Sequence, residues 1–230
     1  PKEMLPLGGR PVIDFAVDEG IDAGCTRIAV VIRHGKETIR RHLSACHPLV
    51  QFLVQQCPRG EMDAIALAEN VAGGEPVAVI YPDNIYLPAP GALRHLATAF
   101  ATGRRDVVAL TRLTVAQAVA TSSAGRVDVE PGDGSRGPIR RFLPKKPGCF
   151  EPRFPGEPRA TGIAIYGPHL FESVHRVRAR VPPGEELTDR WVRELLVNER
   201  GVDGVLLPGT VFDVGNPAGY ALCQGALDRP

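Results

Sequence analysis

A single carboxylate follows directly on a short apolar stretch near the middle of the chain. Val77–Ile80 is this stretch, and Asp83 lies three residues after it, next to Asn84. The β-branched residues, with glycine and proline on both sides, predict a strand buried on both faces. Ligands of open α/β sheets bind at the carboxyl ends of strands, so Asp83 is well placed to hold Mg²⁺ against phosphate oxygens. The alternative is that Asp83 and Asn84 only cap a turn.

Strand and helix patterns alternate on both sides of this stretch. Because consecutive strands joined by helices favour parallel pairing, the pattern predicts an α/β fold with a Rossmann-like, mostly parallel sheet and flanking helices. The predicted strands are Arg27–Arg33, Leu49–Val54, Val77–Ile80 and Asp106–Thr111, and the predicted helices are Val12–Ile21, Lys36–Leu43, Met62–Val71 and Gly91–Thr102.

The texture changes after about residue 120, where Gly, Pro and charged residues predict a small β-ribbon built from Arg126–Glu130 and Ile139–Leu143. Gly132–Gly137 matches G-x-G-x-x-G, but a second strand follows it instead of a helix, so a glycine-rich hairpin is favoured over a phosphate loop. The later predicted elements are strands at Gly162–Tyr166, Val205–Leu207 and Val211–Val214, and helices at Leu187–Glu199 and Asn216–Ala226. We expect residues 1–230 to form a single domain.

Composition excludes several classes of protein. The chain has 27 Lys and Arg against 26 Asp and Glu, and 6% aromatic residues, which argues against a nucleic-acid partner. Its five cysteines include no C-x-x-C pair, which favours a reduced, cytoplasmic protein without a zinc cage. No apolar run approaches the roughly 18 residues of a membrane-spanning helix, so no membrane partner is expected.

Six stretches, in order along the chain, resemble the bacterial UTP–glucose-1-phosphate uridylyltransferases and the wider family of sugar-1-phosphate nucleotidyltransferases. These stretches are Pro1–Pro6 (PKEMLP), Val77–Asn84, Lys145–Pro147 (KKP), Thr161–Tyr166 (TGIAIY), Glu186–Asp189 (ELTD) and Phe212–Tyr220 (FDVGNPAGY). The resemblance implies a fold of the nucleotide-diphospho-sugar transferase type, with the β-ribbon on the sugar side. It also implies Mg²⁺-dependent transfer of a nucleotidyl group from UTP to glucose 1-phosphate, giving UDP-glucose and pyrophosphate.

The resemblance assigns roles to individual residues. It implies that Asp83 and Asp213 hold Mg²⁺, with Asp83 counted among the catalytic residues, and that Lys2 contacts the triphosphate while Lys146 contacts the sugar phosphate. The residues implied to bind the rest of the substrates are Gln55 and Gly60 near the base, Gly162 near the sugar, and Glu186 of the ELTD motif. Each lysine and aspartate also has a structural alternative, as a solvated surface charge or a turn cap.

The chain departs from the family pattern at three places. The G-x-G-T-R loop that cradles the triphosphate would lie ahead of Pro1, so the domain is expected to be incomplete at its N-terminus. Lys145 replaces the acid of E-K-P, and Met62 replaces a second glycine near the base. These departures leave open another nucleotide, another sugar or a cyclitol phosphate, or a non-catalytic paralogue that binds sugar nucleotides. Self-association as a homo-oligomer is open as well.

Overall fold

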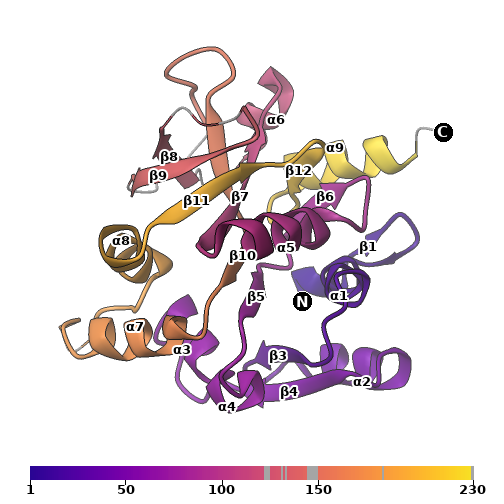
Figure 1. Cartoon of the computed structure of the whole chain (residues 1–230). Coiled ribbons are helices and arrows are strands. Elements are labelled where there is room, and N and C mark those ends of the chain that lie inside the picture. The colour runs from indigo at the N-terminus through magenta and orange to yellow at the C-terminus, as the bar shows by residue number, and fades with distance from the viewer. Residues whose placement is uncertain (122–124, 131, 133, 144–149, 183, 229–230) are drawn as a thin grey trace.

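The computed structural model describes residues 1–121, 125–130, 132, 134–143, 150–182 and 184–228 (Figure 1). Its strands are β1 (Pro6–Leu7), β2 (Arg10–Pro11), β3 (Ile28–Ile32), β4 (Val50–Val54), β5 (Val77–Ile80), β6 (Asn84–Leu87), β7 (Asp106–Arg112), β8 (Gly125–Val129), β9 (Arg136–Phe142), β10 (Pro158–Tyr166), β11 (Val202–Leu206) and β12 (Thr210–Asp213). Its helices are η1 (Lys2–Met4), α1 (Val12–Asp22), α2 (Glu37–Cys46), α3 (Glu61–Ala66), α4 (Glu69–Ala72), α5 (Ala92–Gly103), α6 (Val115–Val119), α7 (His169–Arg178), α8 (Asp189–Glu199) and α9 (Pro217–Leu227).

A six-stranded sheet forms the centre of the molecule, in the order β5-β10-β7-β11-β9-β8. The predicted mixed α/β fold with flanking helices is confirmed, but the predicted parallel pairing is wrong for most of this sheet. Within the described residues, only β7 with β11 and β3 with β4 pair in parallel. The reason is β10, which comes late in the chain and inserts antiparallel between β5 and β7. An alternation of consecutive elements gives no information about such an insertion.

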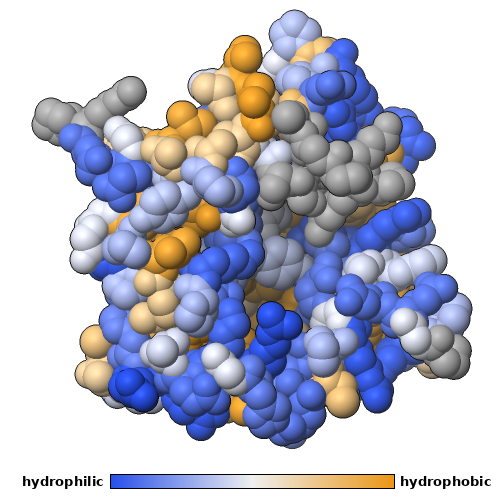
Figure 2. Space-filling view, turned by 180° about the vertical axis from the view of Figure 1, so that it is seen from behind, coloured by the Kyte–Doolittle hydropathy of each residue, from blue (hydrophilic) through white to orange (hydrophobic). Residues whose placement is uncertain are grey.

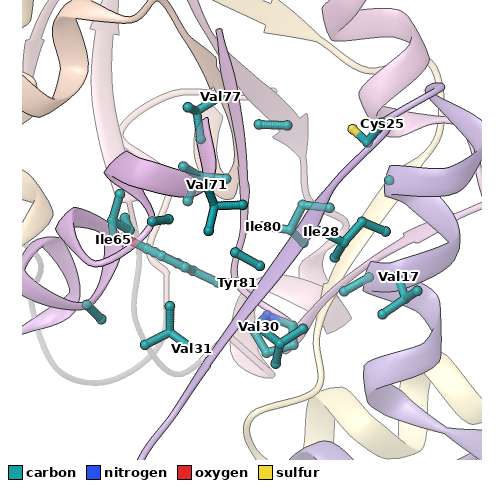
Figure 3. A pocket seen from close by; sticks show the side chains of 18 of the residues that line it. Val17, Cys25, Ile28, Val30, Val31, Ile65, Val71, Val77, Ile80 and Tyr81 are labelled. Atoms are coloured by element: carbon teal, nitrogen blue, oxygen red, sulfur yellow. The ribbon is translucent and has the colours of Figure 1, made fainter. Parts of the chain in front are cut away.

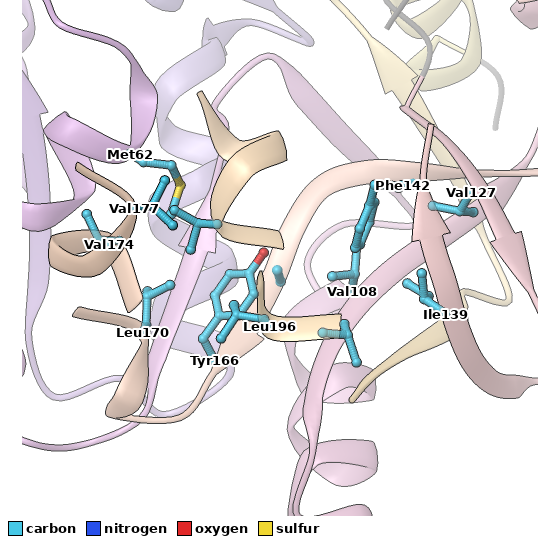
Figure 4. Packing of buried hydrophobic residues seen from close by; sticks show 14 of the residues in the cluster. Met62, Val108, Val127, Ile139, Phe142, Tyr166, Leu170, Val174, Val177 and Leu196 are labelled. Carbon is cyan, nitrogen blue, oxygen red and sulfur yellow. The ribbon is translucent and has the colours of Figure 1, made fainter. Parts of the chain in front are cut away.

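Helices cover both faces of this sheet, and each face has its own apolar core. Helix α5 packs on one face, where Leu93 and Leu96 meet Val107 and Ile163 of the sheet. Helices α3, α7 and α8 pack on the other face. Figure 4 shows this second core, which includes Met62, Val108, Tyr166, Leu170, Val174, Val177 and Leu196.

The predicted β-ribbon is present and extends the central sheet. β8 and β9 form an antiparallel hairpin in which Val127 pairs with Phe142. β9 also pairs with β11, and β8 touches β10 through the pair Arg159–Arg126. A hairpin instead of a phosphate loop is therefore confirmed, because β8 and the paired strand β9, which includes Gly137, follow one another here with no helix among the described residues between them. Asp133 lies outside the described residues.

Local patterns located most of the other elements to within a few residues. The predicted helix Met62–Val71 is two short helices, α3 and α4, and the elements η1, β1, β2, β6, α6 and α7 were not predicted. Strand β6 matters for function because it pairs with β12, which joins the middle of the chain to its end.

The face opposite to the view of Figure 1 is mostly hydrophilic over its lower half and hollowed near its centre (Figure 2). Among the residues that the structure describes, no helix is both long enough and apolar enough to cross a membrane.

Candidate active site

Two carboxylates predicted to hold a metal lie side by side because of the β6–β12 pairing. Asp83 immediately precedes β6 and Asp213 ends β12, with Asp213 in register with Asn84. A Cβ placed on Gly215 would lie 2.9 Å from Oδ2 of Asp83 and 3.0 Å from Oδ1 of Asp213. Both carboxylates therefore face the same small space, which stays open because residue 215 has no side chain.

Backbone and side-chain donors hold the two carboxylates in place. The Asn84 amide donates to Oδ1 of Asp83 at 3.1 Å, and the backbone N–H of Gly215 donates to Oδ1 of Asp213 at 3.0 Å. The backbones are joined as well, since the N–H of Val214 donates to the carbonyl of Asp83 at 2.9 Å. Asp213 thus does cap a turn, as the structural alternative predicted, through its bond with the N–H of Gly215. It does not cap helix α9, because Asn216 does so by accepting from the N–H of Gly219 at 2.9 Å.

Lys2 reaches this pair of carboxylates from the N-terminal segment. Its Nζ donates to Oδ2 of Asp83 at 2.6 Å, although about half of the lysine side chain is exposed. Burial favours the neutral amine, but the hydrogen bond to Asp83 and the charges of Asp83, Glu3 and Asp213 outweigh it and raise the pKa of Lys2. The ion pair of Glu3 with Lys36, at 2.7 Å, ties this segment to α2. Lys2 is therefore a positioned cation and not a freely solvated one.

A polar cavity of about 180 Å³ lies next to the carboxylates. Its lining residues come from β5–β6, β8, β10, α8 and β12: Tyr81, Asp83, Asn84, Gly125, Arg159, Ala160, Thr161, Gly162, Asp189, Arg193 and Asp213. Sequence reasoning did not identify Arg159 or Arg193, because an isolated arginine in a strand or helix has no local signature. Asp189 was present only as the last residue of the ELTD motif.

The oxygen atoms of two carboxylates are suitable ligands for a hard cation such as Mg²⁺. This cation binds in protein sites through one or two carboxylates together with phosphate and water oxygens. Among the described parts of the chain, no group of three or more His, Cys, Asp or Glu side chains could hold a metal ion. A cation between Asp83 and Asp213 would therefore depend on phosphate oxygens for further ligands. The residues present fit that requirement.

Of the predicted substrate-binding residues Gly60, Gly162 and Glu186, only Gly162 lines the polar cavity. A Cβ on Gly162 would come within 2.7 Å of the Tyr81 side chain, so this glycine makes room for Tyr81 while it also lines the polar cavity. Gly60 has a φ of +105°, and a Cβ there would lie 2.5 Å from the carbonyl of Leu187. Glu186 is exposed and does not line the polar cavity.

Gln55 directly follows β4. Its amide nitrogen donates to the Gly60 carbonyl at 3.2 Å and to Asp63 at 3.1 Å. The structure thus brings Gln55 and Gly60 together; neither residue lines the polar cavity, whereas Gln55 lines the larger one. Lys146 lies outside the described residues.

A second cavity, of about 750 Å³, lies between β3 and β5. Figure 3 shows that aliphatic side chains line it, among them Ile28 and Val30 of β3 and Val77 and Ile80 of β5. β3 and β5 are not paired with each other, and all of Val77–Ile80 is only half-buried, so the predicted burial on both faces is wrong. Charged and polar side chains, including Arg33, Lys36 and Gln55, line the larger cavity as well. The smaller polar cavity is the candidate active site because Asp83 and Asp213 line it.

Comparisons with known proteins show what the chain as a whole is similar to. A family model described as "MobA-like NTP transferase domain" matches residues 1–178. The chain is 27% identical to the UTP–glucose-1-phosphate uridylyltransferase of Escherichia coli K12, covering 96% of this chain and 80% of that protein. It is 26% identical to a putative UTP–glucose-1-phosphate uridylyltransferase of Bacillus subtilis, covering 96% and 86% of the two chains.

Solved structures show the same fold. A UDP-glucose pyrophosphorylase complexed with UDP-glucose superposes with a TM-score of 0.81 at 22% identity, over 98% of this chain and 89% of that one. A UTP-bound UGPase from Acinetobacter baumannii gives a TM-score of 0.75 at 20% identity, over 98% and 85% of the chains. The resemblance inferred from the six sequence motifs is confirmed.

Proposed function

From the premise that this chain belongs to the family of MobA-like NTP transferase domains, we propose that it joins UTP and glucose 1-phosphate into UDP-glucose and pyrophosphate with Mg²⁺. The observation that carries the proposal is the shared space between Asp83 and Asp213 above Gly215, with Lys2 at its edge. The relatives named for the same reaction support the choice of substrates.

This reaction requires the protein mainly to neutralise the charge of the two anionic reactants and to align them. An oxygen of the sugar phosphate attacks the α-phosphorus of the triphosphate, a new P–O bond forms, and pyrophosphate leaves with the electron pair of the broken bond. The attacking phosphate is already ionised near neutral pH, so no general base has to remove a proton. Held by Asp83 and Asp213, Mg²⁺ would neutralise phosphate oxygens of both reactants.

In our proposal, different side chains bind different parts of the two substrates. Lys2 donates from Nζ to the triphosphate, where a compact charge on a flexible stem can follow the leaving pyrophosphate. Lys146 contacts the sugar phosphate, a role that rests on the resemblance alone. Gln55 and Gly60 sit on the base side and Gly162 and Glu186 on the sugar side, with residues 1–230 acting as one cytoplasmic domain.

A panel of nucleoside triphosphates and sugar 1-phosphates, assayed for release of pyrophosphate, tests the proposal. We expect release to be fastest with UTP and glucose 1-phosphate and to stop when EDTA removes the metal. A faster reaction with another pair would reassign the substrates. Binding of UDP-glucose without release from any pair would instead make the chain a non-catalytic sugar-nucleotide binder.

Replacing Gly215 with Ala should disable the cation site without unfolding the protein. The added methyl would lie within 3.0 Å of an oxygen of each carboxylate, so Asp83 and Asp213 have to move apart. We expect turnover to fall on the order of 10²-fold, the size of effect seen when one stabilising group is lost, and the Mg²⁺ concentration for half-maximal rate to rise.

The matched control is Gly225→Ala, because a Cβ at Gly225 on α9 meets no atom within 4 Å. That variant should keep the turnover of the parent protein and melt at the same or a slightly higher temperature, because Ala favours a helix over Gly. Equal turnover in Gly215→Ala and Gly225→Ala would show that the space above Gly215 does not have to admit a cation.

A further inference from the structure

Arg159 is a buried cation without a hydrogen-bond partner among the described residues. It lies on β10, is 3% exposed, and neither Nε nor Nη2 has an acceptor. Leaving charged donors unsatisfied away from water costs free energy, and natural proteins rarely keep such a group unless it has a function. The cost suggests that a ligand supplies the missing acceptor.

The other fully buried arginine near the site behaves differently. Arg193 of α8 is 6% exposed, and its guanidinium contacts Oδ2 of Asp189 at 3.0 Å and the hydroxyl of Tyr166 at 3.2 Å. Arg126, which pairs with Arg159 across β8 and β10, has Glu157 as its carboxylate partner at 3.2 Å. The lack of an acceptor is thus particular to Arg159 and is not a general property of this region.

Arg159 lines the polar cavity together with Asp83 and Asp213. Burial lowers the pKa of Arg159 from its usual range, while the charges of Asp213 and Asp83 act in the opposite direction. Lys2 contacts Asp83 at 2.6 Å but does not line this cavity. Among the described residues, the cations that line it are Arg159 and Arg193, and Arg193 already has Asp189 and Tyr166 as partners.

We propose that Arg159 binds the phosphate group of the acceptor sugar 1-phosphate, with its two free donors directed at two phosphate oxygens. This inference rests on the proposed function and adds a residue to it. A planar guanidinium can donate to two oxygens of one phosphate at once, and such charge-assisted bonds are among the strongest in proteins. The position in the same cavity as the two carboxylates would hold the attacking oxygen near the metal, while Lys2 serves the triphosphate.

A purely structural role for Arg159, as a counter-ion to Asp83 and Asp213, makes a different prediction. If it were a counter-ion, its removal would leave two carboxylates facing each other and lower the stability of the free protein. If it awaits a ligand, its removal relieves a desolvated, unpaired charge, so the free protein should melt at the same temperature or higher.

The test measures binding of inorganic phosphate and of glucose 1-phosphate by calorimetry in EDTA, so that no metal contributes. We expect Arg159→Gln to weaken both about ten- to a hundredfold, as loss of charged hydrogen bonds implies. Arg159→Lys should recover part of the loss, because it keeps the charge without the planar fork. The matched control is Arg94→Gln, an exposed arginine on α5, which should bind both ligands like the parent.

Kinetics assign the ligand to one substrate. In Arg159→Gln, the KM for glucose 1-phosphate should rise about tenfold or more, and the KM for UTP should stay within about twofold. Unchanged phosphate binding, a lower melting temperature of the free variant, or a KM change confined to UTP would each overturn the inference.

The inference and the proposed function can fail separately. If the parent protein binds glucose 1-phosphate, Arg159→Gln does not, and no pair of substrates releases pyrophosphate, the role of Arg159 stands and the catalytic function falls. If transfer proceeds and Arg159→Gln binds glucose 1-phosphate like the parent, the function stands and the role of Arg159 falls.

Discussion

Asp83→Asn is expected to lower turnover by about a hundredfold or more. The amide keeps the size of the side chain but removes the negative charge that a hard cation prefers. It also removes the ion pair with Lys2, whose Nζ lies 2.6 Å from Oδ2 of Asp83. Release of pyrophosphate at saturating UTP, glucose 1-phosphate and Mg²⁺ measures this effect. The melting temperature should change little, because the Asp83 side chain is partly exposed and its ion pair with the half-exposed Lys2 contributes little to stability.

Asp18→Asn is the control for this change. Asp18 is a partly exposed aspartate on α1 that also pairs with a basic side chain, Arg10, but it does not line the polar cavity. Its substitution should leave turnover intact. If Asp83→Asn and Asp18→Asn turned over equally fast at saturating Mg²⁺, Asp83 would have no place in the metal site.

Glu157→Gln is expected to destabilise the fold by about 3 kcal/mol, since removing one partner of a buried ion pair leaves the other charge uncompensated. The Glu157 side chain is fully buried, and it accepts from Arg126 at 3.2 Å and from the Arg153 side chain at 2.7 Å. It also accepts from the backbone N–H of Arg153 at 2.5 Å. Glu157 therefore ties the segment before β10 to the β-ribbon, next to Gly125 and Arg159 of the cavity. Urea unfolding measures the loss.

Glu199→Gln provides the comparison at the surface. Glu199 accepts two hydrogen bonds from Arg176, at 2.6 Å and 2.7 Å, yet both side chains are largely exposed. Exposed pairs of this kind contribute little to stability, so the unfolding midpoint should hardly move. A similar loss in both variants would mean that burial of Glu157 does not set the strength of its ion pairs.

Local sequence was sufficient for most of the elements and for the family. The apolar run Val77–Ile80 predicted strand β5, with Asp83 shortly after its carboxyl end, and Pro217 after Asn216 predicted the start of α9. These signals are readable because periodicity, turn residues and helix caps depend on neighbours a few positions away. Six short motifs in order carried the resemblance that the comparisons confirm.

The tertiary structure alone decided which distant residues meet. The pairing of β6 with β12 brings Asp213 to Asp83, and the antiparallel insertion of β10 buries Arg159 beside them. Contacts between segments this far apart depend on which apolar faces bury each other across the whole chain, and no local pattern records that choice. For this reason the sequence determined the family and its two aspartates, whereas the unpaired guanidinium next to them became visible only in the folded chain.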